Sequence, residues 1–233
     1  MRTFFKLTLA TVVAAVVLAM PTQANAAFVM KLTSSSAGVK TITDGGGDDS
    51  AGAAGQITFL GGWGAFSIQV DTGLTKPILG TAANPAMDLN YVVVRTGGTT
   101  LETLTIEISD TDYTRSPTKA RVNFGGTNGL TNSTTSSATA GIDYQNLNFV
   151  TDDASISLGT FGSGAFAAAN SFGINAPGVY SLTIGVTISS TGPTSASGNL
   201  ALAVPEPASF AMWGIGALGM MFAFKRRQTK LVA

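Results

Sequence analysis

The chain has 233 residues, of which 11% are charged, and its formal net charge is zero. It contains no histidine and no cysteine, which excludes Ser/His/Asp and Cys/His nucleophile systems, zinc sites that need these residues, and disulfide scaffolds. Residues 27–204 carry seven Lys or Arg and twelve Asp or Glu, a net charge of −5, so we expect no nucleic-acid partner.

The N-terminus has the three parts of a secretory signal peptide. Arg2 and Lys6 precede a largely apolar run from residue 7 to residue 20, and the small residues Ala24 and Ala26 mark a site for signal peptidase. The apolar run is about 14 residues long, which is shorter than the roughly 20 residues that a spanning helix needs. We therefore predict that residues 1–26 are a signal peptide, cleaved after Ala26, and that the rest of the chain is exported.

Alternation of apolar and polar residues predicts β-strands through the middle of the chain, most regularly from Tyr180 to Ile188. Shorter segments of this kind lie at 57–60, 66–70, 91–95, 104–108, 121–124, 142–149 and 155–161. About nine strands without a sustained helical pattern predict an all-β antiparallel sandwich or jelly-roll-like domain over residues 27–188. The one helical candidate, residues 165–172, is short and flanked by glycines, which favours a loop or a single turn.

Acidic residues gather in the predicted turns of this domain. The candidates for metal ligands are Asp44, Asp48, Asp49, Asp110 and Asp112, with a further pair at Asp152 and Asp153. Calcium accepts several carboxylate and carbonyl oxygens in loops, although none of these segments matches the EF-hand pattern. Aspartate also favours turns because it bonds its own backbone. We expect no cofactor, with a calcium site as the alternative.

Three features bear on carbohydrate or ice as ligands. Trp63 lies between glycines and either stacks on a sugar ring or packs in the core. Glu102 or Glu107 paired with an aspartate is the residue type that glycoside hydrolysis needs, although Glu107 falls on the predicted solvent face of a strand. A regular threonine ladder on a sheet would support ice binding, and the spacing of threonines along this sequence is irregular.

The C-terminal part divides into a linker, an apolar run and a basic end. Residues 189–204 are rich in Ser, Thr and Gly, which predicts a flexible linker. Residues 208–224 are uncharged and are followed by Lys225, Arg226 and Arg227 within a basic end at 225–230. This pattern predicts a short transmembrane helix with its C-terminus in the cytoplasm and the β-domain outside.

The order of Pro205, Glu206 and Pro207, the apolar run and the basic cluster resembles the PEP-CTERM sorting signal, and the resemblance is confined to residues 205–233. It implies recognition by an exosortase, a membrane-embedded cysteine transpeptidase-like enzyme of Gram-negative bacteria that make exopolysaccharide. The two prolines and the glutamate would be the sorting motif and would have no catalytic role. A permanent single-pass membrane anchor is the alternative.

Together these features predict an exported, non-enzymatic protein of the cell surface or the extracellular matrix. Signal peptidase and an exosortase are its expected processing partners, and extracellular polysaccharide is its candidate ligand. The alternatives are a polysaccharide- or ice-binding β-module and a hydrolase that uses two carboxylates.

Overall fold

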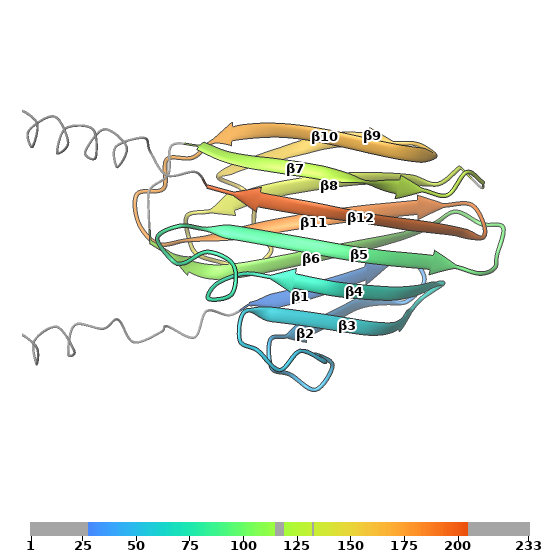
Figure 1. Ribbon diagram of the computed structural model, residues 1–233, viewed down its shortest axis with the longest axis horizontal. Helices are drawn as coiled ribbons and strands as arrows, with labels where there is room; N and C mark the ends of the chain where they lie inside the picture. Colours follow the sequence, from blue (N-terminus) through green and yellow to red (C-terminus); the bar gives the residue numbers. More distant parts are fainter. Residues whose placement is uncertain (1–27, 115–118, 132, 205–233) are drawn as a thin grey trace, which may run out of the picture.

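The computed structural model describes residues 28–114, 119–131 and 133–204, which form two six-stranded antiparallel sheets that face each other (Figure 1). The first sheet has the order β2 (Gly38–Thr43), β1 (Val29–Ser34), β6 (Glu102–Tyr113), β11 (Tyr180–Ser190), β8 (Thr135–Asp143) and β9 (Ala154–Phe161). The second sheet has the order β10 (Gly164–Gly173), β7 (Lys119–Asn128), β12 (Thr194–Ala203), β5 (Ala86–Arg95), β4 (Phe66–Leu74) and β3 (Gln56–Trp63). The expected all-β antiparallel fold is confirmed for these residues.

The expected helices at the two termini, including the transmembrane segment 208–224, lie outside the described ranges. Within those ranges, no helix is long and apolar enough to cross a membrane.

The core lies between the two sheets and is built by the alternation that the sequence displays. On β11, the apolar residues from Leu182 to Ile188 point inward and are fully buried. On β5, in the facing sheet, the alternate residues from Met87 to Val93 are also fully buried. Each such side chain stabilises the folded state by about 1.5–3 kcal/mol relative to leaving it in water. Packing between the sheets therefore holds together a domain that has no disulfide.

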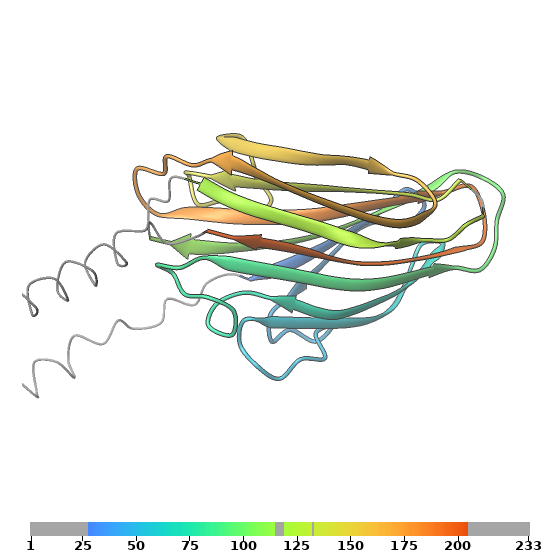
Figure 2. The same ribbon diagram turned by 45° about the horizontal axis from the view of Figure 1, so that its top comes forward.

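Both ends of the described domain lie at one end of the sandwich, which we call the entry end (Figures 1 and 2). Phe28, directly before β1, is 1% exposed and its carbonyl accepts a hydrogen bond from the backbone N–H of Asp44. The loop between β4 and β5 lies at the same end, because the N–H of Thr114, after β6, donates to the carbonyl of Ala82 in that loop. The entry end therefore gathers the two termini of the domain and the ends of strands from both sheets.

The segment 165–172, expected to be a loop or a helical turn, is part of strand β10. It pairs with β7 along its whole length. Phe166 stacks on Phe161 at a centroid distance of 4.9 Å and packs on Phe124 at 4.8 Å, and Phe172 is buried. Phe166 and Phe172 are six positions apart and therefore point to the same, inner face, while Ala165, Ala167 and Ala169 are exposed, so the segment fits a strand at the sandwich edge. The expectation was wrong because alanines occupy both faces of this strand, so the sequence shows no clear alternation of apolar and polar residues.

The segment 189–204, expected to be a flexible linker, belongs to the sandwich. Its first residues complete β11, and Thr194–Ala203 form β12, which pairs with β5 on one side and β7 on the other. Leu200 and Leu202 are buried between the sheets. Small polar residues alternate here with buried apolar ones, and long-range pairing on both edges fixes the strand. The folded domain therefore extends to Val204, and the linker prediction was wrong.

Two further differences concern strand boundaries. The strand expected at 142–149 ends at Asp143, because β8 runs from Thr135 and the next ten residues turn toward β9. Strands β1 and β2, which form one edge of the first sheet, were not predicted.

Candidate functional site

The junction between the sandwich and the sorting tail is short. After β12, the N–H of Val204 donates to the carbonyl of Pro85 at 3.0 Å, and Val204 is 6% exposed. The sorting residues Pro205, Glu206 and Pro207 follow immediately in the sequence. These three lie outside the described residues, as do the basic residues Lys225, Arg226 and Arg227 and the cleavage-site residues Ala24 and Ala26.

Four polar side chains meet inside the entry end. The Nζ atom of Lys76 lies 2.8 Å from Oδ2 of Asp110, and the same oxygen accepts a hydrogen bond from the hydroxyl of Thr75 at 2.6 Å. The Tyr113 hydroxyl lies 2.6 Å from the Thr75 hydroxyl and donates to Oδ2 of Asp110 at 3.2 Å. Burial raises the pKa of Tyr113 well above its usual value, and the charge of Asp110 raises it further. The cluster links a loop of the second sheet to strand β6 of the first.

The candidate ligands after β2 are bound by donors from the chain itself. Asp44 accepts a hydrogen bond from the N–H of Gly55 at 2.7 Å, and Asp48 forms an ion pair with Lys40 at 2.9 Å. Asp49 accepts three backbone N–H groups, from residues 45, 51 and 58, at 2.9–3.0 Å. Burial raises the pKa of Asp44, a backbone hydrogen bond lowers it in part, and the charges of Asp49 and Asp110 raise it further.

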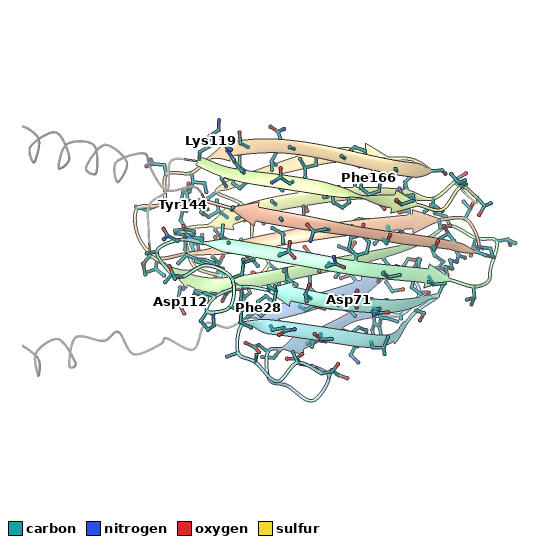
Figure 3. The ribbon with its side chains drawn as sticks, viewed as in Figure 1. Phe28, Asp71, Asp112, Lys119, Tyr144 and Phe166 are labelled. Atoms are coloured by element: carbon teal, nitrogen blue, oxygen red, sulfur yellow. The ribbon has the colours of Figure 1, made fainter. Side chains whose placement is uncertain are left out.

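Asp112 lies at the same end of the sandwich but has a different partner (Figure 3). It exchanges two hydrogen bonds with Asn146, both 2.8 Å long, and its φ of +63° places it in the left-handed region. Asp153 accepts a hydrogen bond from the N–H of Tyr144. Among the residues in the described ranges, no three of the His, Cys, Asp or Glu type come together in a way that could hold a metal ion.

A groove of about 470 Å³ lies on the outer face of the second sheet, over β10, β7 and β12. Its lining residues are Asn123, Phe124, Gly125, Ala167, Ala168, Ala169 and Asn199. Strand register places Gly125 between Ala167 and Asn199, so small residues form the floor and amide side chains the rim. The amide of Asn199 also donates to Oδ1 of Asp88 at 2.8 Å. This surface was not predicted, because neither β10 nor β12 was expected to be a strand.

The outer face of the first sheet carries rows of hydroxyl groups. One row crosses five strands in register, through Thr33, Thr105, Thr187, Ser137 and Thr160. The hydroxyls of Thr105 and Thr187 lie 3.0 Å apart. Ser109 and Thr183, whose hydroxyls lie 2.8 Å apart, are buried, and Ser109 accepts a hydrogen bond from the N–H of Phe149. The residues of the row are irregularly spaced along the sequence, and strand register brings them into one row across the sheet.

The remaining sequence candidates have structural partners of their own. Trp63 is partly buried against the core and its Nε1 donates to the carbonyl of Gly38 at 3.0 Å. Glu102 accepts a hydrogen bond from the hydroxyl of Ser35, which lowers the pKa of this exposed carboxyl. Glu107 lies on the outer face of β6, where it pairs with Lys31 at 2.8 Å.

Comparison with solved structures gives distant similarities. The enzymatically active domain of Bacteriophage CBA120 tailspike protein 4 is 14% identical at a TM-score of 0.33, with 60% of this chain and 19% of that chain covered. TmCBM61, solved with β-1,4-galactotriose, is 9% identical at a TM-score of 0.31, covering 61% of this chain and 90% of that one. The N-terminal cellulose-binding domain of Cellulomonas fimi β-1,4-glucanase C is 12% identical at a TM-score of 0.30, with 69% of this chain and 93% of that chain covered. Similarities at these TM-scores carry no functional conclusion.

No curated protein matches the chain. The family described as the PEP-CTERM protein-sorting motif matches residues 203–227. The match begins on the last residue of β12, spans Pro205 to Pro207 and ends at Arg227. The chain therefore carries a PEP-CTERM protein-sorting motif at its C-terminal tail.

Proposed function

We propose that the chain is an exported exosortase substrate whose β-sandwich is delivered to the cell surface or the extracellular polysaccharide matrix. The bacterium would be an exopolysaccharide-producing Gram-negative species. Signal peptidase removes residues 1–26, the apolar run 208–224 holds the chain in the membrane, and the exosortase cleaves at Pro205–Pro207. The sandwich is then released as a non-enzymatic surface protein.

The observation that carries this proposal is the sorting-motif match at residues 203–227, which begins on the last residue of the last strand. Because Val204 is hydrogen-bonded into the sandwich, cleavage near Glu206 leaves the folded domain complete. At the other end, removal of the signal peptide after Ala26 leaves the buried Phe28 and all of β1 in place. Both processing events thus fall just outside the packed domain.

Mass-spectrometric mapping of both termini, in cell-bound and released protein from the native host, tests the proposal. We expect a start at Ala27 and an end near Pro205 to Pro207. A variant with Pro205, Glu206 and Pro207 all changed to alanine should keep its tail, whereas a control variant, Thr229→Ala, should be processed normally. An intact tail through Ala233 in every mature molecule would make the chain a permanent anchor and contradict the proposal.

The groove on the second sheet supports a second candidate function, which is binding of a neutral polysaccharide. Its volume is within the range of ligand sites, and Asn123 and Asn199 offer both donors and acceptors to hydroxyl groups. The net charge of −5 over residues 27–204 disfavours acidic polysaccharides. We favour polysaccharide over ice, because the charged pair Lys31–Glu107 interrupts the hydroxyl rows of the first sheet.

Affinity electrophoresis in gels that contain a neutral glucan, a neutral galactan or a uronic-acid polysaccharide tests this second function. We expect retardation by a neutral polymer only, and loss of the retardation in the Asn123→Ala/Asn199→Ala double variant. Asn170→Ala removes an exposed amide of β10 that does not line the groove, so it should bind normally. Equal retardation of all three proteins would exclude the groove as the binding site.

A further inference from the structure

The ion pair between Lys76 and Asp110 differs from the other ion pairs of the described residues in its burial. Its side chains are 11% and 0% exposed. The Lys31–Glu107 pair, with the same 2.8 Å separation, is 25% and 23% exposed, and the Lys40–Asp48 pair is 24% and 55% exposed. Burying an isolated ion pair costs several kcal/mol per charge, which mutual attraction recovers only in part. Lys76 and Asp110 are therefore held together at a site where both charges are costly.

The surroundings fix both reactive groups and exclude bulk water. Oδ1 of Asp110 accepts the backbone N–H of Thr111 at 2.8 Å, while Oδ2 accepts the hydroxyls of Thr75 and Tyr113. Nζ of Lys76 also donates to the carbonyl of Thr111 and lies 4.1 Å from the centroid of the Tyr113 ring. The carboxyl group thus has separate donors on its two oxygens, with the amine nitrogen beside one of them.

We propose that Lys76 and Asp110 are joined by an intramolecular amide bond. One proton first passes from the Lys76 ammonium to Oδ2 of Asp110, because only the neutral amine has the lone pair that attack requires. Nζ of Lys76 then attacks Cγ of Asp110, the new C–N bond forms, and the bond from Cγ to Oδ2 breaks. The lysine ammonium begins with three protons and the amide nitrogen keeps one of them. The other two pass to Oδ2, which leaves as water. The reaction is a condensation and needs no oxidant, reductant or activated co-reactant.

The geometry supplies what this condensation requires. Fixing the two groups in contact replaces a bimolecular encounter, which removes much of the entropic part of the barrier in well-oriented reactions. The N–H of Thr111 points at Oδ1, where negative charge develops in the tetrahedral intermediate. The hydroxyls of Thr75 and Tyr113 point at Oδ2, the leaving oxygen, and stabilise its departure.

The bond would link the two sheets covalently. Lys76 follows β4 of the second sheet, and Asp110 lies on β6 of the first. A chain without cysteine has no disulfide with which to make such a link. The link would lie at the entry end, where, under the proposed function, the membrane-held tail leaves the sandwich. A covalent bond between the sheets at this end resists their separation in an exported protein.

A tryptic digest of the full-length chain, isolated as folded protein, detects the bond directly. Trypsin cleaves after Lys40, Arg95 and Arg115 but not at Lys76, because Pro77 follows it. Lys76 therefore lies in the peptide 41–95 and Asp110 in the peptide 96–115. We expect one branched species that contains both peptides and is lighter than their sum by the mass of one water molecule. Fragmentation should assign the link to Lys76 and Asp110.

Two variants control the experiment. Lys76→Arg keeps a cation at the site and the same cleavage pattern but has no amine, so the peptides 41–95 and 96–115 should separate. Lys31→Arg alters the exposed pair of equal length and should leave the branched species unchanged. The wild-type digest alone decides the matter even if Lys76→Arg fails to fold. Complete recovery of the two peptides as separate species from folded wild-type protein would overturn the proposal.

Discussion

The backbone N–H of Val204 donates to the carbonyl of Pro85 across 3.0 Å, so the chain is held in the sandwich up to the residue directly before Pro205. β12, which leads to this residue, is paired on both sides and cannot detach without breaking two strand ladders. The distance between the folded domain and the sorting motif is therefore set by the fold and not by a flexible spacer.

A spacer inserted at this junction should change the rate of processing. We expect a short Gly-Ser insertion between Val204 and Pro205 to speed removal of the tail, because the exosortase would then approach the motif without the bulk of the sandwich beside it. Pulse labelling in the native host measures the conversion of precursor to released protein. The same insertion in the β9–β10 turn, after Gly162, is the control. A slower or unchanged conversion would show that proximity of the folded domain does not limit cleavage.

Some elements of the fold can be read from the sequence because one local pattern determines them. From Tyr180 to Ile188 every second residue is apolar, and the structure buries those residues in a central strand. The segment from Thr194 to Ala203 has the composition of a linker, and its role as a strand depends on the neighbours β5 and β7, which are more than 60 residues away in the sequence. Composition reports local preference, whereas pairing partners are a property of the whole fold.

The candidate sites also differ in whether a local sequence pattern or long-range strand pairing determines them. The sorting motif is a contiguous pattern, so the sequence alone was sufficient to find it. The cluster of Lys76 and Asp110 joins positions 34 residues apart on different sheets. The hydroxyl row through Thr105 and Thr187 joins positions 82 residues apart. Neither arrangement has a signature along the chain, since strand register brings the residues together.

Removal of divalent cations should leave the stability of the protein unchanged. Asp44, Asp49 and Asp112 already accept hydrogen bonds from donors of the chain, and these donors occupy oxygens that a calcium ion would need. We expect the same midpoint of thermal unfolding with EDTA and with added calcium. A clear rise in the midpoint with calcium but not with magnesium would instead establish a calcium site, and Asp49→Asn would then localise it.

Gly198 should be intolerant of a side chain. A Cβ atom at this position of β12 would lie 2.8 Å from the hydroxyl oxygen of Tyr91 and 2.9 Å from the carbonyl oxygen of Gly125. Because one of these contacts is backbone, the clash cannot be relieved by rotating a side chain. We expect Gly198→Ala to lower the free energy of unfolding in urea by about 1–3 kcal/mol. Gly178→Ala, where a Cβ meets nothing within 4 Å, is the control and should change it little.

Tyr91 should make the protein sensitive to alkaline pH. Burial between the sheets raises the pKa of its phenol to about 12 from an ordinary value of 10.0, because the phenolate is poorly solvated there. As the pH rises from 10 to 12, the unfolded chain loses this proton before the folded chain does. The stability that the neutral phenol maintains below pH 10 is therefore lost across this interval, at a cost of about 2–3 kcal/mol.

Urea unfolding of the wild type and of Tyr91→Phe, at about pH 9 and about pH 11.5, measures this contribution. At the lower pH we expect the two proteins to differ by no more than about 1 kcal/mol, since the phenol is neutral in both states. At the higher pH the variant should be the more stable, because it has no phenol to ionise on unfolding. Lysine titration and the buried Tyr113 affect both proteins alike, so the difference between them isolates Tyr91. An equal loss of stability in both would mean that Tyr91 ionises as readily in the folded protein as in the unfolded chain.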